Sequence, residues 1–340
     1  MNFSSDTSAP AHPNVIEAMM AANTGMAASY GGDSGTAALR EKLAAVFETG
    51  DFDYWMTASG TASNALALSC FCPATGAVLC HEEAHIQRDE RGAPEFFSGG
   101  GKLHLLPGFG ARIDREALEA ALAGINRAFV HETPAEVLSL TNLTECGTAY
   151  RAAEVALYAG MAAEKGLAVH MDGARLGNAL VSTTASAAEM TWRAGVDVLT
   201  FGLTKTGGIG CEVILLFGRA RTKFAELQVR AKRSGHMPPK MRFLAAQAHA
   251  MLDGGLWLEL AGQANARAQE LAAAFIAAGY ELAFPVDGNE VFAFLPEAAA
   301  KRLAAAGGKF YPWPGGSYRF VCSWCTGADE VAAVAEALRA

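Results

Sequence analysis

The sequence contains no uninterrupted apolar run that approaches the ~20 residues needed for a membrane-spanning helix. Its first residues also lack the basic and then apolar pattern of a secretory signal, so we expect a cytoplasmic protein with no membrane partner. An excess of basic residues is lacking too, since 27 Lys and Arg stand against 35 Asp and Glu, for a formal net charge of -8. This balance argues against a nucleic-acid partner, because such proteins usually carry a basic surface.

Cysteines and charged residues are both sparse. Seven Cys occur among 340 residues, an odd number, and they form no dense disulfide framework. Cys322 and Cys325 make one C-x-x-C pair with no second pair nearby, so we interpret them as packed thiols rather than as a metal or redox site. Charged residues amount to 18% and hydrophobic residues to 51%, which excludes extended disorder and supplies material for a large core.

Short apolar segments alternate with helical patterns along most of the chain. The expected strands are 54–57, 77–80, 137–140, 167–171, 196–201 and 211–217. The expected helices between them are 13–23, 36–48, 61–70, 114–123, 149–165 and 186–194. Strands that are apolar throughout and separated by helices predict an α/β fold, with a mostly parallel sheet and helices on both faces.

A long helical pattern over 261–278 divides the chain. Shorter units follow it, with strands over 291–295 and 318–323 and helices over 297–306 and from Ala328 onward. We therefore predict an N-terminal segment and large domain over 1–254, and a smaller α/β domain over 255–340.

One short motif is typical of a metal site. His81-Glu82-Glu83-Ala84-His85 matches H-E-x-x-H, which on a helix places two imidazoles for zinc and a carboxylate for catalysis. The motif directly follows an apolar strand and lacks a long amphipathic helix around it. We therefore expect a loop with at most one functional His and no metal; a zinc-dependent hydrolase that uses His81 and His85 is the alternative.

Two glycine-rich segments suggest phosphate loops but lack the required pattern. Residues 99–102 miss the first Gly of a P-loop and the hydroxyl after its Lys, so we expect a surface loop. Residues 207–210 are followed by a strand rather than a helix, which argues against a nicotinamide cofactor.

The strongest signal is an acid and an amine after two neighbouring strands. Asp172 closes one strand, and Lys205 lies in a small, hydroxyl-rich loop after the next. Ligands of parallel α/β sheets gather at the C-terminal ends of the strands, so both side chains are expected at one edge. Pyridoxal phosphate needs a Lys for its imine and an acid to keep its pyridine nitrogen protonated. Taken alone, Asp172 is equally a strand-end cap, and Lys205 a solvated loop residue.

A phosphate site completes this interpretation. Ser59, Gly60 and Thr61 lie between an expected strand and an Ala-rich helix. Backbone N–H groups at a helix N-terminus, two hydroxyls and a Gly that permits close approach are typical of an anion site. Thr204 could add a further hydroxyl.

Segments spread in order along nearly the whole chain match one family. They are 5–7, 30–33, 58–65, 84–85, 92–93, 137–142, 170–178, 203–208, 242–247 and 319–321. The sequence resembles the pyridoxal-phosphate-dependent low-specificity L-threonine aldolases, of the fold-type-I, β-eliminating-lyase-like group. The resemblance implies a fold-type-I transferase-like architecture and a lyase. Its reaction is the reversible retro-aldol cleavage of L-threonine, L-allo-threonine or related β-hydroxy-α-amino acids to glycine and an aldehyde.

The resemblance also implies roles in cofactor binding. Lys205 would form the imine with the cofactor aldehyde, and Asp172 would pair with its pyridine nitrogen. Arg175 would lie near the phenolic oxygen or the phosphate. His85 would stack on the ring and help with proton transfer. The phosphate would be held by Ser59, Gly60 and Thr61.

The substrate side is implied in the same way. Ser5 and Arg319 would hold the substrate carboxylate, for which Arg offers a planar two-pronged donor. Tyr30 would line the site from its own or a neighbouring subunit, since the resemblance implies a homodimer or homotetramer.

Two features leave alternatives open. Thr144 stands where many family members have a His, so the base that removes the β-hydroxyl proton is either His85 or an ordered water. A β-eliminating lyase on the same scaffold would share every cofactor residue and differ only in its substrate pocket.

Overall fold

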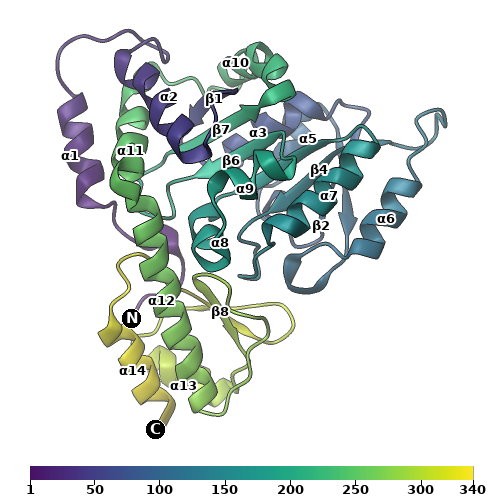
Figure 1. The fold of residues 1–340 in the computed structure, drawn as a ribbon. Helices are drawn as coiled ribbons and strands as arrows, with labels where there is room; N and C mark the ends of the chain where they lie inside the picture. Colours follow the sequence, from purple (N-terminus) through teal and green to yellow (C-terminus); the bar gives the residue numbers. More distant parts are fainter. Residues whose placement is uncertain (340) are drawn as a thin grey trace.

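The computed structural model describes residues 1–339, which fold around a seven-stranded sheet (Figure 1). Its strands are β1 (Phe52–Thr57), β2 (Ala77–His81), β3 (Lys102–Leu106), β4 (Ala135–Thr141), β5 (Ala168–Gly173), β6 (Val198–Gly202) and β7 (Glu212–Phe217). They lie in the order β1-β7-β6-β5-β4-β2-β3. Only β7 runs against its neighbours, while β3, β2, β4, β5 and β6 pair in parallel. The predicted mostly parallel sheet is confirmed.

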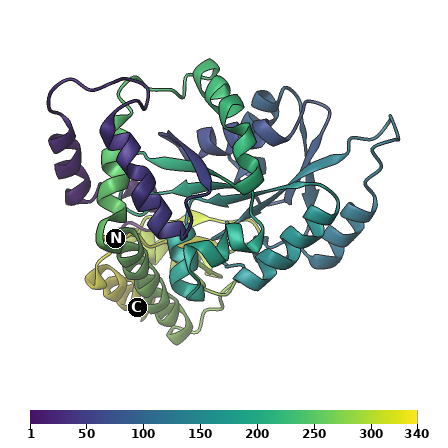
Figure 2. The ribbon, with the colours of Figure 1, turned by 45° about the horizontal axis from the view of Figure 1, so that its top comes forward.

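Helices cover both faces of this sheet (Figure 2). Helix α3 packs against β1, β6 and β7, whereas α7 packs against β4 and β5. The helices up to the end of the large sheet are α1 (Pro13–Ala22), α2 (Ser34–Phe47), α3 (Gly60–Phe71), α4 (His85–Arg88), α5 (Ala93–Ser98), α6 (Arg115–Ala123), α7 (Ala152–Glu164), α8 (Leu176–Thr183) and α9 (Ala187–Met190). Those that follow are α10 (Phe224–Arg233), α11 (Arg242–Leu252), α12 (Leu256–Ala277), α13 (Glu297–Ala305) and α14 (Ala328–Arg339).

The sequence patterns missed several of these elements. Strand β3 begins at Lys102, inside the segment expected to be a surface loop, and its exposed position at the sheet edge leaves it without an apolar run. Helix α10 has no counterpart among the expected helices, and its Leu227 and Ala231 are buried. Of the supposed packed thiols, Cys322 is buried whereas Cys325 is exposed.

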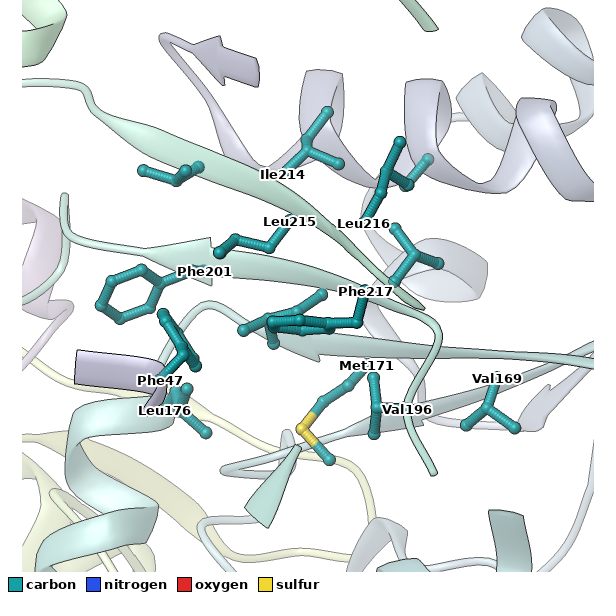
Figure 3. Packing of buried hydrophobic residues seen from close by; sticks show 14 of the residues in the cluster. Phe47, Val169, Met171, Leu176, Val196, Phe201, Ile214, Leu215, Leu216 and Phe217 are labelled. Atoms are coloured by element: carbon teal, nitrogen blue, oxygen red, sulfur yellow. The ribbon is translucent and has the colours of Figure 1, made fainter. Parts of the chain in front are cut away.

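The main core lies between the large sheet and its helices. The ring of Phe47 on α2 lies 5.4 Å from the ring of Phe201 and 5.7 Å from that of Phe217, measured between centroids (Figure 3). Met171 and Leu176 are also fully buried in this cluster. Each such side chain stabilises the fold by about 1.5–3 kcal/mol, so the strands that carry the site are held firmly side by side.

A second hydrophobic cluster packs against the far part of α12. It contains a small sheet of β8 (Glu290–Ala293), β9 (Tyr311–Pro312) and β10 (Tyr318–Val321), together with α13 and α14. Phe3 belongs to the same cluster and accepts a hydrogen bond from the Val321 N–H at 2.8 Å. The start of the chain therefore packs with its last hundred residues before it runs back to the large sheet. Within residues 1–339, no helix combines the length and apolarity required to cross a bilayer.

Candidate active site

A cavity of about 240 Å³ opens where β4, β5 and β6 end. In the sheet register, Thr141 at the end of β4 lies beside Asp172, and Asp172 lies beside Thr200 of β6. Because these strands are parallel and end level with one another, the loops that follow them meet at one edge. The lining residues are Thr7, Ala58, Ser59, Gly60, Thr61, Asn64, His85, Thr141, Leu143, Glu145, Asp172, Ala174, Arg175, Thr204, Lys205 and Glu212. The structure thus brings the predicted acid and the predicted amine together.

The carboxylate of Asp172 is buried, and each of its oxygens accepts a hydrogen bond. Its Oδ1 accepts the Ala174 N–H at 3.0 Å, and its Oδ2 accepts a hydrogen bond from Asn64 Nδ2 at 2.7 Å. Burial opposes ionisation, but the charges of His85 and Lys205 outweigh it and hold the pKa of Asp172 below its ordinary value. Asp172 is therefore an ionised acid that can keep a basic nitrogen protonated.

His85 starts helix α4 and is joined to this acid through a hydrogen-bonded chain. Its Nδ1 donates to Glu90 Oε1 at 2.7 Å, and the same oxygen accepts from Asn64 Nδ2 at 2.9 Å. Burial disfavours the imidazolium, but the hydrogen bond with Glu90 and the charge of Asp172 raise the pKa of His85 above its ordinary value. Asn64 donates to both acids, so it fixes the distance between the ring of His85 and Asp172.

The N-terminus of helix α3 faces the cavity. Ser59 caps the helix, with its Oγ accepting the Ala62 N–H at 3.3 Å. The amides that open a helix have no acceptor within it, and they favour an anion. A Cβ added to Gly60 would meet no atom within 4 Å, so space is open in front of these amides. Ser59, Gly60 and Thr61 all line the cavity at this point and fit a phosphate, whereas the hydroxyl proton of Thr204 is already donated to Glu212.

Lys205 enters the cavity from the loop after β6. Thr204 holds this loop, because its Oγ1 accepts the Cys211 N–H at 3.0 Å and donates to Glu212 Oε1 at 2.5 Å. Gly208 closes the loop by donating its N–H to the Leu203 carbonyl at 3.0 Å. The Thr-Lys-Thr-Gly-Gly sequence therefore makes a closed turn that presents the amine.

Two arginines beside the cavity are linked through one shared acid, Glu290. Arg175 donates to both oxygens of Asp6, at 2.7 and 3.1 Å, and its Nη1 lies 3.5 Å from Glu290 Oε2. Arg319 on β10 donates to Glu290 Oε1 from Nε at 3.0 Å and from Nη2 at 2.6 Å. Arg175 lines the cavity directly, and Glu290 connects Arg319 to it.

The other two predicted substrate residues lie farther from the cavity. Ser5 caps a short turn, and its Oγ accepts the N–H of Thr7, which lines the cavity. Tyr30 lines a separate hollow near Tyr54, and the Lys232 ammonium lies 4.5 Å from its ring centre. One chain alone does not bring Tyr30 to the cavity, so its predicted role requires a second subunit.

Sequence reasoning missed four polar residues of this site. Asn64 is hidden in an Ala-rich helix, Glu90 in a charged stretch, Glu145 in a loop and Glu212 at the start of a strand. The sequence signal for Glu212 is its position as the first residue of the apolar run Glu-Val-Ile-Leu-Leu-Phe. This position places its carboxyl at the buried start of strand β7. Burial raises the pKa of Glu212 to about 7.

The H-E-x-x-H pattern does not form a helical metal site. His81 ends strand β2, while His85 begins α4. The ring nitrogens of His81 bond to the Gly108 carbonyl and the Glu83 N–H, each at 2.9 Å. The two imidazoles therefore do not lie one helical turn apart, as the zinc ligands of this motif must.

Thr144, at the position where many family members have a His, does not line the cavity. Its hydroxyl donates to the Gly110 carbonyl at 2.9 Å.

Pyridoxal phosphate needs an amine for its aldehyde, an acid for its ring nitrogen and an anion site for its phosphate, and the cavity offers one of each. A mostly parallel sheet that presents these groups at its strand ends makes this chain a pyridoxal-phosphate-dependent enzyme of fold type I. The sequence model of the beta-eliminating lyases matches residues 2–298. The chain belongs to this family and is a lyase.

Similar proteins agree with this assignment. The chain is 40% identical to a low specificity L-threonine aldolase of Pseudomonas sp. (strain NCIMB 10558), over 99% of this chain and 97% of that protein. A low specificity L-threonine aldolase of Pseudomonas aeruginosa is 39% identical, over 99% and 96%. Among solved structures, a Leishmania major threonine aldolase superposes with a TM-score of 0.92 at 27% identity, covering 99% of this chain and 98% of that one.

Proposed function

We propose that this enzyme cleaves L-threonine, L-allo-threonine or a related β-hydroxy-α-amino acid to glycine and an aldehyde, in a reversible retro-aldol reaction. The observation that carries the proposal is the meeting of Lys205 and Asp172 in one cavity, with Arg175 on its wall. The names of the two Pseudomonas relatives and of the Leishmania structure support the same reaction.

The cofactor residues have separate tasks. Lys205 would hold the cofactor through its aldehyde, and Asp172 would keep the ring nitrogen protonated. Ser59, Gly60 and Thr61 bind the phosphate at the start of α3. The protonated ring, once bound, withdraws electrons from the substrate's α-carbon.

The substrate residues orient the bond that breaks. Arg319 and Ser5 hold the substrate carboxylate, with Arg319 aimed by its two hydrogen bonds to Glu290. His85 would cover one face of the cofactor ring, and its hydrogen bond with Glu90 holds the imidazole in place. Fixing the carboxylate and the ring together selects which bond at the α-carbon lies perpendicular to the ring, and so selects the reaction.

Two measurements test this function. An absorbance spectrum before and after borohydride, with mapping of the labelled peptide, should show one cofactor per chain, bound to Lys205. Incubation with each threonine isomer should then release glycine and acetaldehyde. 2-Oxobutanoate and ammonia instead would make the enzyme an amino-acid β-eliminating lyase, and chelator-sensitive activity without a cofactor band would favour a hydrolase.

We further propose that the protein works in the cytoplasm as a homodimer or homotetramer, with the domains divided near residue 255. The half-exposed Tyr30, away from its own chain's cavity, supports a site shared between subunits. Light scattering after size-exclusion chromatography tests the assembly. A monomer with full aldolase activity would contradict it.

A further inference from the structure

The loop after β4 brings one more carboxyl to the cavity wall. Glu145 lines the cavity, and its Oε1 accepts the main-chain N–H of His85 at 2.7 Å. Its other oxygen, Oε2, is buried and has no hydrogen-bond partner among residues 1–339. One oxygen thus fixes the orientation of the carboxyl, and the other is left to act on a ligand.

The other carboxyls near the cavity are each bonded to a different part of the site, although Glu90 Oε2 and Glu212 Oε2 also lack a hydrogen-bond partner among residues 1–339. Both oxygens of Asp172 accept hydrogen bonds, and Glu90 Oε1 receives bonds from His85 and Asn64. Glu212 lines the cavity and accepts a hydrogen bond from Thr204, in the loop that carries Lys205. Glu145 is the cavity-lining acid that is bonded to the backbone of His85 and whose loop packs against Glu290.

Glu145 also lies on the substrate side of the cavity. Its loop packs against the arginine network, because a Cβ added to Gly147 would come within 3.0 Å of Glu290, the partner of Arg319. At its other end, the carboxyl touches the backbone of His85. Glu145 is therefore placed between the ring predicted to cover the cofactor and the group predicted to hold the substrate carboxylate.

The groups around Glu145 raise the pKa of its carboxyl to about 7. The charged and titratable groups that face it are Asp172 of β5, Arg175 after β5, His85 of α4, Cys80 of β2, Tyr150 before α7 and the adjacent Cys146. Burial first and the negative charge of Asp172 second raise the pKa of Glu145 to about 7. A general base is most effective when its pKa lies close to the working pH.

We propose that Glu145 is the base that removes the β-hydroxyl proton of the substrate, an assignment that rests on the retro-aldol function proposed above. The substrate O–H bond breaks and its proton passes to Glu145 Oε2, while the O–H electron pair becomes the second bond of the new carbonyl. The Cα–Cβ bond breaks, and its electron pair stays with the glycine fragment until that fragment takes up a proton. In the reverse direction, protonated Glu145 returns the proton to the aldehyde oxygen.

The deciding variant is Glu145→Gln in the holoenzyme. The amide keeps an oxygen for the His85 N–H but cannot take a proton, so threonine cleavage should fall about 100- to 10,000-fold. Glycine has no hydroxyl, so its affinity, measured from the absorbance change of the bound cofactor, should stay within about twofold of wild type. Glu145→Asp should recover part of the lost cleavage. Glu83→Gln, a change close to the same loop but outside the cavity lining, is the matched control.

The pH profile gives an independent readout. The wild-type kcat/KM should fall with an acid limb near pH 7, set by the pKa of about 7 at Glu145, and Glu145→Gln should lose that limb. Cleavage at the wild-type rate by Glu145→Gln would overturn the assignment. A loss of glycine affinity as large as the loss of cleavage would also overturn it, because it would make Glu145 a structural residue. Failure of the wild type to release glycine from any β-hydroxy-α-amino acid would instead contradict the proposed function.

Discussion

Arg319 donates two hydrogen bonds to one buried oxygen, Glu290 Oε1, from Nε at 3.0 Å and from Nη2 at 2.6 Å. Glu290 is fully buried, and its second oxygen lies 3.5 Å from Arg175. The guanidinium predicted to hold the substrate carboxylate is thus placed by an acid that also contacts the cavity wall. The proposed substrate contact and the packing of β10 against β8 therefore involve the same pair, Arg319 and Glu290.

Replacing Arg319 separates these two roles. Arg319→Lys keeps the charge next to Glu290 but loses the two-pronged geometry, so KM for threonine should rise about tenfold, with a smaller change in kcat. Arg319→Ala removes a partner of a buried acid and should lower the free energy of unfolding by about 3 kcal/mol. Steady-state kinetics and urea denaturation measure the two effects. An unchanged KM in Arg319→Lys would argue against carboxylate binding by this residue.

Removing the amine tests the covalent attachment of the cofactor. Lys205→Ala should abolish turnover, and borohydride should no longer fix the cofactor to the chain. Lys301→Ala, at a lysine whose side chain is 75% exposed, is the matched control and should behave as wild type. Mass spectrometry of the reduced protein and a glycine assay give the answer. Full activity in Lys205→Ala would remove this lysine from the mechanism.

The strand ends of the large sheet could be predicted because they depend on local patterns. Apolar runs locate β5 and β6, and parallel strands bring the loops after them to one edge, so Asp172 and Lys205 could be placed together from sequence. The cap at Ser59 was predictable for the same reason, because a hydroxyl before an Ala-rich run is a local signal.

The remaining polar residues depend on contacts between distant segments. Asn64 meets Asp172 across 108 positions of the chain, and Arg175 meets Asp6 across 169, which no spacing rule encodes. A single acid in a loop, such as Glu145, has the sequence pattern of a solvated residue until the fold buries one of its oxygens. For Tyr30 the fold of a single chain is not enough either: Tyr30 lines a separate hollow, and its predicted role requires a second subunit.

His85→Asn should make apoenzyme stability depend differently on pH. The pKa of His85 in the folded protein lies above its ordinary value of 6.5, so the ion pair with Glu90 stabilises the fold most where the imidazole is protonated. The advantage of wild type over His85→Asn in unfolding free energy should therefore be larger near pH 6.5 than near about pH 9. Urea denaturation across this range measures it. A difference that grows with rising pH would mean that His85 is neutral in the folded apoenzyme.

Glu212→Gln should show the same direction of change, because folding also raises the pKa of Glu212. The carboxyl of Glu212 is buried, its Oε2 has no hydrogen-bond partner within residues 1–339, and burial raises its pKa from 4.5 to about 7. An acid whose pKa rises on folding contributes stability while it is protonated, and this contribution is lost as the pH rises through about 7.

The amide of Glu212→Gln can still accept the hydrogen bond from Thr204 but cannot ionise. The apoenzyme variant should therefore gain thermal stability relative to wild type as the pH is raised from about 5 to about 8. Glu132→Gln, at an exposed loop position, serves as the control and should follow wild type at every pH. Melting curves in matched buffers decide the point, and a wild-type-to-variant difference that stays constant with pH would mean that Glu212 does not titrate in this range.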